Sequence, residues 1–479
     1  MLRRSLVHDN SQSAALNVTP EWLERHDREG PRYTSYPTAV ELHEGFSADD
    51  YATRLAAANT RSSTPLSLYL HLPFCEERCL FCGCHVLISP HRERALPYLD
   101  DLHREFNIVA EHLPDRRTFA QLHLGGGTPT FFSPRELESA LLPLFEQFTP
   151  VPGAELAIEV DPVVTSQEHL AALAGLGFNR LSVGVQDFTP KVQEAIGRIQ
   201  SREETAAILD GARSRGFSGL NVDLIYGLPY QTPETFAETI DAVIDLGADR
   251  AAVYSFAFVP WLRGHQKKLP REAFPDREAK FQLFSVARER FLAAGYVPIG
   301  MDHFARPDDE LAKARRAGTL RRNFQGYTVI PADDVIGFGI SSIGDVDGAL
   351  VQNEKKWSTF HDHLVAGRLP IERGFMRSAD DQVRRAVIAD LMCNFRVDVR
   401  KIERDHGIDF ASTFTEDLAR LQPYVREGLA EVGPDPTHPQ TIRATPLGEL
   451  VVRNIAQCFD LYWREKHEGD DRPRFSRTI

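Results

Sequence analysis

The sequence predicts an α/β protein: a partial (β/α)6 barrel, preceded by an N-terminal arm and followed by a mainly helical C-terminal domain. From Ser67 onward, short β-rich runs alternate with longer helical patterns at about 25 to 50 residues per unit, as repeated βα units require. The alternation stops near Phe375, where helical patterns take over. We therefore divide the chain into an arm (1–53), a partial barrel (54–374) and a C-terminal domain (375–479).

The expected elements follow in chain order. The arm is polar, and its Gly30-Pro31 and Tyr33 to Pro37 stretches favour turns and extended chain over helix. The barrel strands are expected at 67–72, 121–126, 155–161, 180–186, 220–227 and 250–257. Between the last two, Thr232 is suited to cap a helix and Gly247 to end it. Two C-terminal helices are expected, over 380–395 and 447–466.

Composition excludes several functions. The 479-residue chain is 42% apolar and 26% charged, which supports a sizeable core. Its net charge of -13 argues against broad attraction to nucleic acid or an anionic membrane, since such binding needs Lys and Arg to neutralise phosphates. The first residues lack the apolar region of a secretion signal, and no stretch approaches about 18 apolar residues. We expect a cytoplasmic monomer without nucleic-acid or membrane partners.

Four of the six cysteines are clustered, at Cys75, Cys79, Cys82 and Cys84. Without a secretion signal, such a cluster favours metal binding or redox chemistry over disulfides. The first three have CxxxCxxC spacing directly after the first strand. Three thiolates on one tight loop can bind three irons of a [4Fe-4S] cluster and leave the fourth iron open to another ligand.

Structural zinc is the competing interpretation of this loop, because four nearby thiolates are adequate zinc ligands. Cys84 lies only two residues after Cys82, so the four cysteines do not easily complete a tetrahedron. The cysteines alone favour the cluster but leave zinc open.

A glycine-rich stretch, Gly125 to Thr130, follows the second expected strand. Glycines at a strand end let the backbone approach a ligand, although an ordinary turn fits equally well. The stretch is neither a P-loop nor a GxGxxG loop. Next to the cysteine loop, it fits a site for the methionyl part of S-adenosylmethionine (SAM).

Polar side chains recur on the strand faces that point into the barrel. Residues two apart share a face. The polar pairs are Tyr69 and His71, Gln121 and His123, Glu159 and Asp161, Ser182 and Gln186, and Asn221 and Asp223. Any one of them fits a hydrogen-bonded core residue, but their recurrence indicates a shared polar site.

The chain resembles the oxygen-independent coproporphyrinogen III oxidases, a family of radical SAM enzymes of haem synthesis. The resemblance covers nearly the whole chain and rests on long motifs: PRYTSYPTA, HLPFCEERCLFCGC, HLGGGTPT, IEVDP, NVDLIYGLPYQTPE, NFQGYT and FSRTI. It implies a radical SAM barrel. The chief departure is an N-terminal extension.

The resemblance also implies residue roles. Cys75, Cys79 and Cys82 would ligate the [4Fe-4S] cluster, and Cys84 would not. The cluster-bound SAM would contact Tyr69, Gly126, Glu159, Ala257 and Ile343, and Phe81 would also be a cofactor-binding residue. A second SAM would contact Gly127, Thr128, Gln186, Arg198 and Asp223.

The implied reaction converts coproporphyrinogen III to protoporphyrinogen IX. A 5′-deoxyadenosyl radical from SAM would take hydrogen from the β-carbon of a propionate, and loss of CO2 and one electron would leave a vinyl group; a second propionate would follow. A small redox protein would donate the electron that cleaves SAM. A tetracarboxylate substrate needs cations, for which the candidates are Arg32, Arg263, Lys267, Lys268, Arg321 and Arg322.

Two other classes of protein remain as alternatives. A haem-binding chaperone related to this family uses the same CxxxCxxC loop, but Cys84, the PRYTSYPTA arm and the NFQGYT region resemble the oxidase. A zinc-dependent structural protein would leave the loop from Gly125 to Thr130 unexplained.

Overall fold

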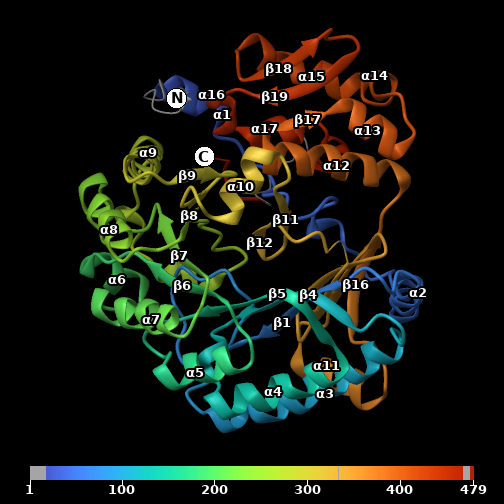
Figure 1. Cartoon of the computed structure of the whole chain (residues 1–479). Helices are drawn as coiled ribbons and strands as arrows, with labels where there is room; N and C mark the ends of the chain where they lie inside the picture. Colours follow the sequence, from blue (N-terminus) through green and yellow to red (C-terminus); the bar gives the residue numbers. More distant parts are fainter. Residues whose placement is uncertain (1–17, 333, 468–474, 479) are drawn as a thin grey trace, which may run out of the picture.

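A twelve-stranded sheet forms the centre of the computed structural model, which describes residues 18–332, 334–467 and 475–478 (Figure 1). Its strand order is β16-β15-β14-β13-β1-β4-β5-β6-β7-β8-β10-β9. Six central strands run parallel in chain order: β1 (Leu66–Leu72), β4 (Thr118–Gly126), β5 (Thr149–Val160), β6 (Arg180–Gln186), β7 (Gly219–Tyr226) and β8 (Arg250–Ser255). The predicted partial (β/α)6 barrel is confirmed.

Helices connect these strands and cover the outer face of the sheet (Figure 1). They are α3 (Leu96–Glu111), α4 (Pro134–Gln147), α5 (Gln167–Gly175), α6 (Pro190–Ile196), α7 (Arg202–Ser214), α8 (Pro233–Asp245) and α9 (Arg277–Ala293). The side chain of Thr232 caps α8, and Gly247 follows its last turn with a φ of 68°, as predicted. Apolar strand residues such as Leu70, Leu124 and Ile158 are fully buried in the core.

Further strands extend both edges of the barrel sheet. β13 (Val335–Phe338) runs parallel beside β1, and β14 (Ile343–Val346), β15 (Ala349–Asn353) and β16 (Ile371–Met376) continue antiparallel from it. At the opposite edge, β10 (His303–Ala305) and β9 (Val297–Ile299) follow β8. Since β16 and β9 are the two edge strands, the sheet is an open barrel.

The arm contains more helix than expected. α1 (Pro20–His26) and α2 (Ala48–Asn59) flank an irregular stretch that includes a short 3-10 helix, η2 (Ala39–Glu41). α2 forms because Ser47 and Asp50 make a capping box and because Tyr51, Leu55 and Ala58 bury one face. The prediction of an irregular arm is wrong there, but residues 30–37 are non-helical as predicted. Most of the N-terminal extension, residues 1–17, lies outside the described residues.

The C-terminal part combines helices with a small sheet. Its elements are α12 (Ala379–Asn394), β17 (Arg396–Asp398), α13 (Val399–His406), α14 (Phe410–Thr413), α15 (Thr415–Arg426), β18 (Ala430–Pro434), β19 (Pro439–Ala444), α16 (Pro446–Glu449), α17 (Val452–Gln457) and a π-helical turn, η7 (Trp463–His467). α12 agrees with prediction, whereas the single helix expected over 447–466 is broken. The β17-β19-β18 sheet was not expected. The proposed boundary at 375 falls within β16.

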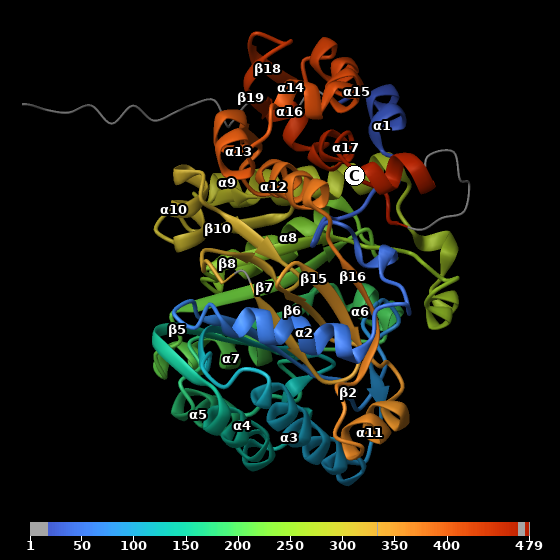
Figure 2. The ribbon, with the colours of Figure 1, turned by 90° about the vertical axis from the view of Figure 1, so that its right-hand side faces the viewer.

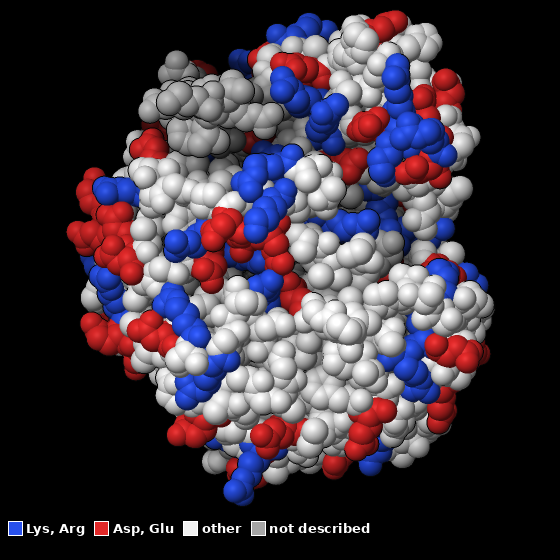
Figure 3. Space-filling model, in the orientation of Figure 1, with Lys and Arg blue, Asp and Glu red and all other residues white. Residues whose placement is uncertain are grey.

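The C-terminal elements lie above the barrel sheet, with α1 beside them (Figure 2). His26 of α1 pairs with Glu427 at 2.9 Å, and Asn454 of α17 donates to the His26 carbonyl at 2.7 Å. Acidic and basic side chains are mixed over the face shown in Figure 3. In the described ranges, no helix has both the length and the hydropathy needed to cross a membrane.

The remaining elements lie in the connections. They are β2 (Phe74–Cys75), β3 (Leu87–Ile88), η3 (Arg92–Arg94), η4 (Pro129–Phe131), η5 (Gly264–Lys268), η6 (Arg271–Ala273), α10 (Glu310–Ala317), β11 (Arg321–Asn323), β12 (Gly326–Thr328) and α11 (Trp357–Val365). β11 and β12 form a hairpin. Thr328 of β12 accepts a hydrogen bond from Gln121 of β4 at 3.2 Å, so the hairpin packs against the inner face of the barrel.

Candidate active site

A cavity of about 520 Å³ lies where the parallel strands meet their following loops. Most of the predicted site residues line it: Cys75, Cys79, Phe81, Cys82, Gly126, Gly127, Thr128, Glu159, Gln186, Arg198 and Asp223. Cys84, Asp161, Ser182 and Tyr254 line it as well. The predicted positions Tyr69, Ala257 and Ile343 do not line this cavity. A ligand here would touch the cysteine loop and the glycine loop together.

The cysteine loop leaves β1 and is fixed by its backbone. Leu87 donates its N–H to the carbonyl of Pro73 at 2.7 Å, and Ser89 donates to that of Cys75 at 3.0 Å. Cys82 donates its N–H to the carbonyl of Cys79 at 3.2 Å. Cys75, Cys79 and Cys82 are partly exposed towards the cavity, and Cys84 is exposed.

The thiols differ in their electrostatics. Burial raises the pKa of Cys75 to about 11 and also raises the pKa of Cys79, against the opposing charge of Arg198. Hydrogen bonding from Cys84 lowers the pKa of Cys82 to about 6, and the Cys84 N–H lies 3.4 Å from the Cys82 Sγ. Cys84 therefore supports Cys82 as a thiolate.

The thiols are not grouped for a single metal ion. Among the described residues, no three His, Cys, Asp or Glu side chains are arranged to hold one. A tetrahedral zinc ion needs its ligands around one centre, whereas a cubane takes thiolates at separate iron corners. Three thiols on one loop at the spacing CxxxCxxC suit the separate iron corners of a cubane.

The glycine loop packs directly against the cysteine loop. Gly127 donates its N–H to the carbonyl of Leu72 at 2.8 Å, and Thr128 donates to that of Phe74 at 2.8 Å. A Cβ on Gly127 would lie 2.6 Å from the Phe74 carbonyl oxygen, and one on Gly126, whose φ is 112°, would lie 2.5 Å from the His71 ring. Only glycine allows this approach, which leaves backbone groups facing the cavity.

A chain of polar groups connects Glu159 with the first strands. His123 Nε2 donates to Glu159 Oε1 at 3.0 Å, and the rings of His123 and Tyr69 stack with centroids 6.1 Å apart. Burial opposes ionisation of Glu159, but the hydrogen bond and charge of His123 hold its pKa below the usual value. Glu159 is therefore an ionised carboxylate in the cavity wall.

His71 completes this chain as a neutral ring. Burial lowers its pKa to about 4, so it carries one proton at neutral pH. Nε2–H donates to the carbonyl of His85 at 3.0 Å, and Nδ1 accepts the hydroxyl of Tyr69 at 2.9 Å. His71 thereby orients Tyr69.

The other two predicted positions outside the cavity are Ile343 and Ala257. Ile343 begins β14 beside Gly337, the β13 partner of Tyr69. Ala257 accepts a hydrogen bond from Gln266.

A second set of polar groups also lines the cavity. Arg198 pairs with Asp161 at 2.8 Å, donates to the carbonyl of Gly184 at 2.7 Å and lies 3.8 Å from the Cys79 Sγ. Its Nε is buried without a partner in the described part of the chain. Asp223 accepts hydrogen bonds from Ser182 at 2.7 Å and Asn221 at 2.9 Å, yet burial raises its pKa. These groups could bind an amino acid or ribose moiety.

The cations predicted to bind the substrate lie in different segments of the structure. Arg32 pairs with Asp302 and lies over the ring of Tyr254, 5.6 Å from its centroid; Arg322 donates to the Arg32 carbonyl at 2.5 Å. Tyr254 lines the large cavity, so this pair lies near it. Arg321 is in the same hairpin strand, β11. Arg263, Lys267 and Lys268 belong to the loop after β8.

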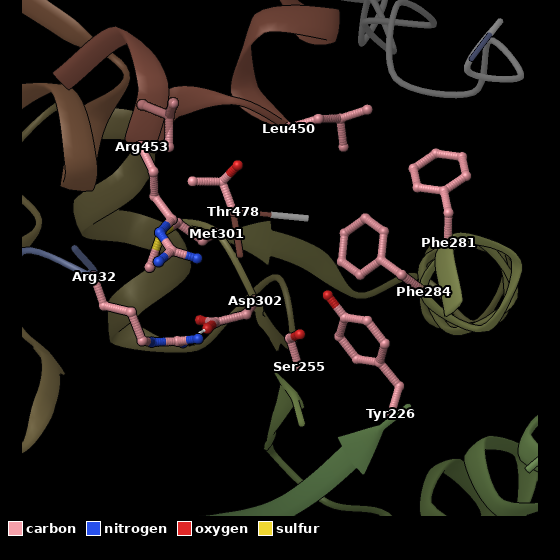
Figure 4. Close-up of a pocket in the computed structure, with 11 residues that line it drawn as sticks. Arg32, Tyr226, Ser255, Phe281, Phe284, Met301, Asp302, Leu450, Arg453 and Thr478 are labelled. Atoms are coloured by element: carbon pink, nitrogen blue, oxygen red, sulfur yellow. Dashed lines mark hydrogen bonds and ion pairs between the residues drawn. The ribbon is translucent and has the colours of Figure 1, made fainter. Parts of the chain in front are cut away.

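Sequence reasoning missed Arg453, which lies with Arg32 and Asp302 around a small cavity of about 40 Å³ (Figure 4). Arg453 Nε donates to the carbonyl of Pro31 at 3.0 Å, and its Nη1 to that of Arg477 at 2.8 Å. Burial and the charge of Arg32 lower its pKa to about 9. The helical pattern around Arg453 does not indicate that this residue contacts the arm and the C-terminal residues. Those contacts depend on segments that are distant from one another in sequence.

This fold and site define a radical SAM protein, and residues 69–243 match the family model of the Radical SAM superfamily. The chain is 41% identical to the oxygen-independent coproporphyrinogen III oxidase of Synechocystis, over 97% of this chain and 98% of the relative. It is 42% identical to that of Pseudomonas aeruginosa, over 95% and 98% of the two chains.

A solved structure of coproporphyrinogen III oxidase from Escherichia coli, described as a radical SAM enzyme, superposes with a TM-score of 0.86. It is 41% identical and covers 90% of this chain and 97% of its own. The chain belongs to the family of oxygen-independent coproporphyrinogen III oxidases.

The residues present fit the cofactors of this superfamily, a [4Fe-4S] cluster and SAM. Three thiols, the backbone of two glycines and the Glu159 carboxylate line one cavity. Cys75, Cys79 and Cys82 would hold the cluster. The cluster and SAM together supply a 5′-deoxyadenosyl radical.

Proposed function

We propose that this chain converts coproporphyrinogen III to protoporphyrinogen IX without oxygen, by oxidative decarboxylation of two propionates in porphyrin and haem synthesis. Each propionate loses a hydrogen atom from its β-carbon, CO2 and one electron, and becomes a vinyl group. The single observation that carries the proposal is the 520 Å³ cavity, which joins the three-cysteine loop to the glycine loop and Glu159 in a family of coproporphyrinogen oxidases.

The protein's own residues bind and orient the reactants. The glycine loop offers its backbone, Glu159 offers an ionised carboxylate to a cationic amine or to ribose hydroxyls, and Tyr69 is held by His71. Arg32 lies over the ring of Tyr254 and Arg322 donates to the Arg32 carbonyl, so we propose that these two arginines attract the substrate's carboxylates.

The experiment uses anaerobically reconstituted, reduced protein with SAM and coproporphyrinogen III. Mass spectrometry should show two successive decarboxylations, with a monovinyl intermediate, while 5′-deoxyadenosine and methionine accumulate. The proposal would be wrong if SAM were cleaved only slowly and no decarboxylated product appeared with any electron acceptor. If the protein then bound haem stoichiometrically, it would be a haem chaperone.

We further propose that the chain binds two SAM molecules. Glu159, which is hydrogen-bonded to His123, lies in the cavity wall, and Arg198, Gln186 and Asp223 form a second group there. Equilibrium dialysis of the reconstituted protein should give two SAM per chain, and Arg198→Gln should give one. A wild-type stoichiometry of one would contradict this proposal.

The chain's partners are a further proposal. A small redox protein is the proposed electron donor, because a cluster that cleaves SAM must be reduced for each turnover. We place this monomeric enzyme in the cytoplasm, where a reducing environment protects free thiols such as the exposed Cys84.

A further inference from the structure

The loop between β8 and α9 is tied to the cysteine loop by three hydrogen bonds. Arg263 Nε donates to the carbonyl of Gly83 at 2.8 Å, His265 Nε2 to that of Cys82 at 2.8 Å, and Gln266 Nε2 to that of Phe81 at 3.1 Å. Three consecutive carbonyls of the cluster-binding segment are thus held by residues 263–266. We call residues 258–268 the clamp loop.

The clamp loop is itself rigidly supported. Gln266 is buried, donates to the carbonyl of Ala257 at 3.2 Å and accepts the N–H of Val259 at 2.7 Å. A hydrophobic cluster lies beneath it, made of Val192, Ile196, Leu228, Phe256 and Leu269, with Leu80 and Phe81 of the cysteine loop packed against it. A protein that binds the outside of the clamp loop is therefore connected to the cluster segment through the three hydrogen bonds of that loop.

The exposed side chains of the clamp loop include both apolar and cationic groups. Trp261 is 49% exposed and Leu262 is 63% exposed. Lys267 and Lys268 are also exposed, and neither has a carboxylate partner among the described residues. Large exposed apolar side chains rimmed by charge are typical of protein interfaces, and tryptophan is enriched among the residues that dominate binding.

We propose that this face is the docking surface for the electron donor and that the donor is a small acidic redox protein. The proposal rests on the proposed function, which requires one electron to pass from a reduced donor to the cluster in each cycle. Because the chain has a net charge of -13, an acidic protein is repelled by the molecule as a whole and is attracted only to local cationic surface. Lys267, Lys268 and Arg263 provide such a surface, beside the cluster segment.

The test measures cluster reduction by two donors in stopped-flow absorbance, with reconstituted full-length protein under anaerobic conditions. The protein donor is a reduced acidic flavodoxin, and the small donor is reduced methyl viologen. Lys267→Glu with Lys268→Glu should lower the second-order rate constant with flavodoxin about tenfold at low salt and weaken its salt dependence. Trp261→Ala should lower it severalfold. The viologen rate should be unchanged, and the exposed Lys313→Glu on α10 is the matched control.

An unchanged flavodoxin rate in both clamp-loop variants would overturn the proposal. It would also be overturned if the viologen and flavodoxin rates fell together, because the loop would then act only on cluster integrity. Since the readout is cluster reduction, it does not depend on coproporphyrinogen. Charge-dependent reduction without decarboxylation would support the docking surface while refuting the proposed function.

Discussion

At the scale of single residues, the site depends on how neighbouring groups set each side chain's state. Cys82 has a pKa of about 6 because Cys84 hydrogen-bonds to it, and His71 has a pKa of about 4 because it is buried. Most of the residues implied by the family motifs line the cavity, but Tyr69, Ala257 and Ile343 do not, and the contact between His123 and Glu159 appears only once β4 and β5 are paired. The spacing of residues along a strand predicts which side chains share a face. A hydrogen bond between two strands also depends on the register in which they pair.

Substitution of individual cysteines should distinguish the cluster ligands from Cys84, which only hydrogen-bonds to a ligand. Cys82→Ser should lose the cluster, because serine is a poor iron ligand, whereas Cys84→Ser should retain about four irons per chain, because its N–H and hydroxyl can still donate to Cys82. Iron and sulfide analysis after anaerobic reconstitution measures both. Loss of iron in Cys84→Ser would make Cys84 a ligand.

Removal of the Tyr69 hydroxyl should destabilise the fold. Tyr69→Phe leaves the buried Nδ1 of His71 without a donor, which costs about 1 to 3 kcal/mol of unfolding free energy. Urea denaturation measures the difference, and Tyr230→Phe, at an exposed tyrosine, is the control. Equal stabilities of the two variants would rule out the His71–Tyr69 bond as a stabilising contact.

At the scale of elements, local signals were sufficient for the six barrel strands and for α8. Each of these elements is marked by residues close together in the sequence. The strands have alternating patterns, and α8 is capped by Thr232 and followed by Gly247 with a positive φ. Strand β13 joins the sheet beside β1 only through a long-range pairing, and no local pattern marks this. The helix expected over 447–466 is instead two short helices and a π-helical turn, and Cys458 and Phe459, which follow α17, are buried in the C-terminal core.

The close packing of two loops makes Gly127 intolerant of a side chain. In Gly127→Ala, the new Cβ would meet the backbone of Pro73 and Phe74, which carry the cysteine loop. SAM affinity, measured by calorimetry on reconstituted protein, should fall at least tenfold. Gly175→Ala, where a Cβ meets nothing within 4 Å at the end of α5, should bind SAM normally. Normal binding by both variants would contradict the tight fit.

At the scale of the whole molecule, the arm, the barrel and the C-terminal segment meet around Arg453. Its guanidinium also donates to the carbonyls of Gly30 and Ser476. Lys280 of α9 lies close to this junction, and burial lowers its pKa to about 8 despite the attraction of Asp27. The junction therefore holds several cations close together. Composition and motifs could not predict it, since it joins the two ends of the described chain.

The lowered pKa of Lys280 predicts a dependence of stability on pH. An unfolded lysine titrates near 10.5, so below about pH 8 the folded state bears the cost of a buried charge, and this cost disappears as pH rises from about 8 to 10.5. Lys280→Met should raise the unfolding free energy by about 1 to 2 kcal/mol at pH 7 and make no difference near pH 10.5. Urea denaturation at both pH values measures this. An advantage that is equal at both pH values would contradict the shifted pKa.

The junction around Arg453 also limits the order in which the chain can complete its fold during synthesis. Arg28 donates its N–H to the hydroxyl of Thr478, and 450 positions separate the two residues. On the ribosome, the six barrel strands can pair in the order in which they emerge, but the arm must wait for residues 453 and 476–478 before its final contacts exist. The side of the nascent barrel that the arm and the last residues cover is thus exposed until translation is nearly finished.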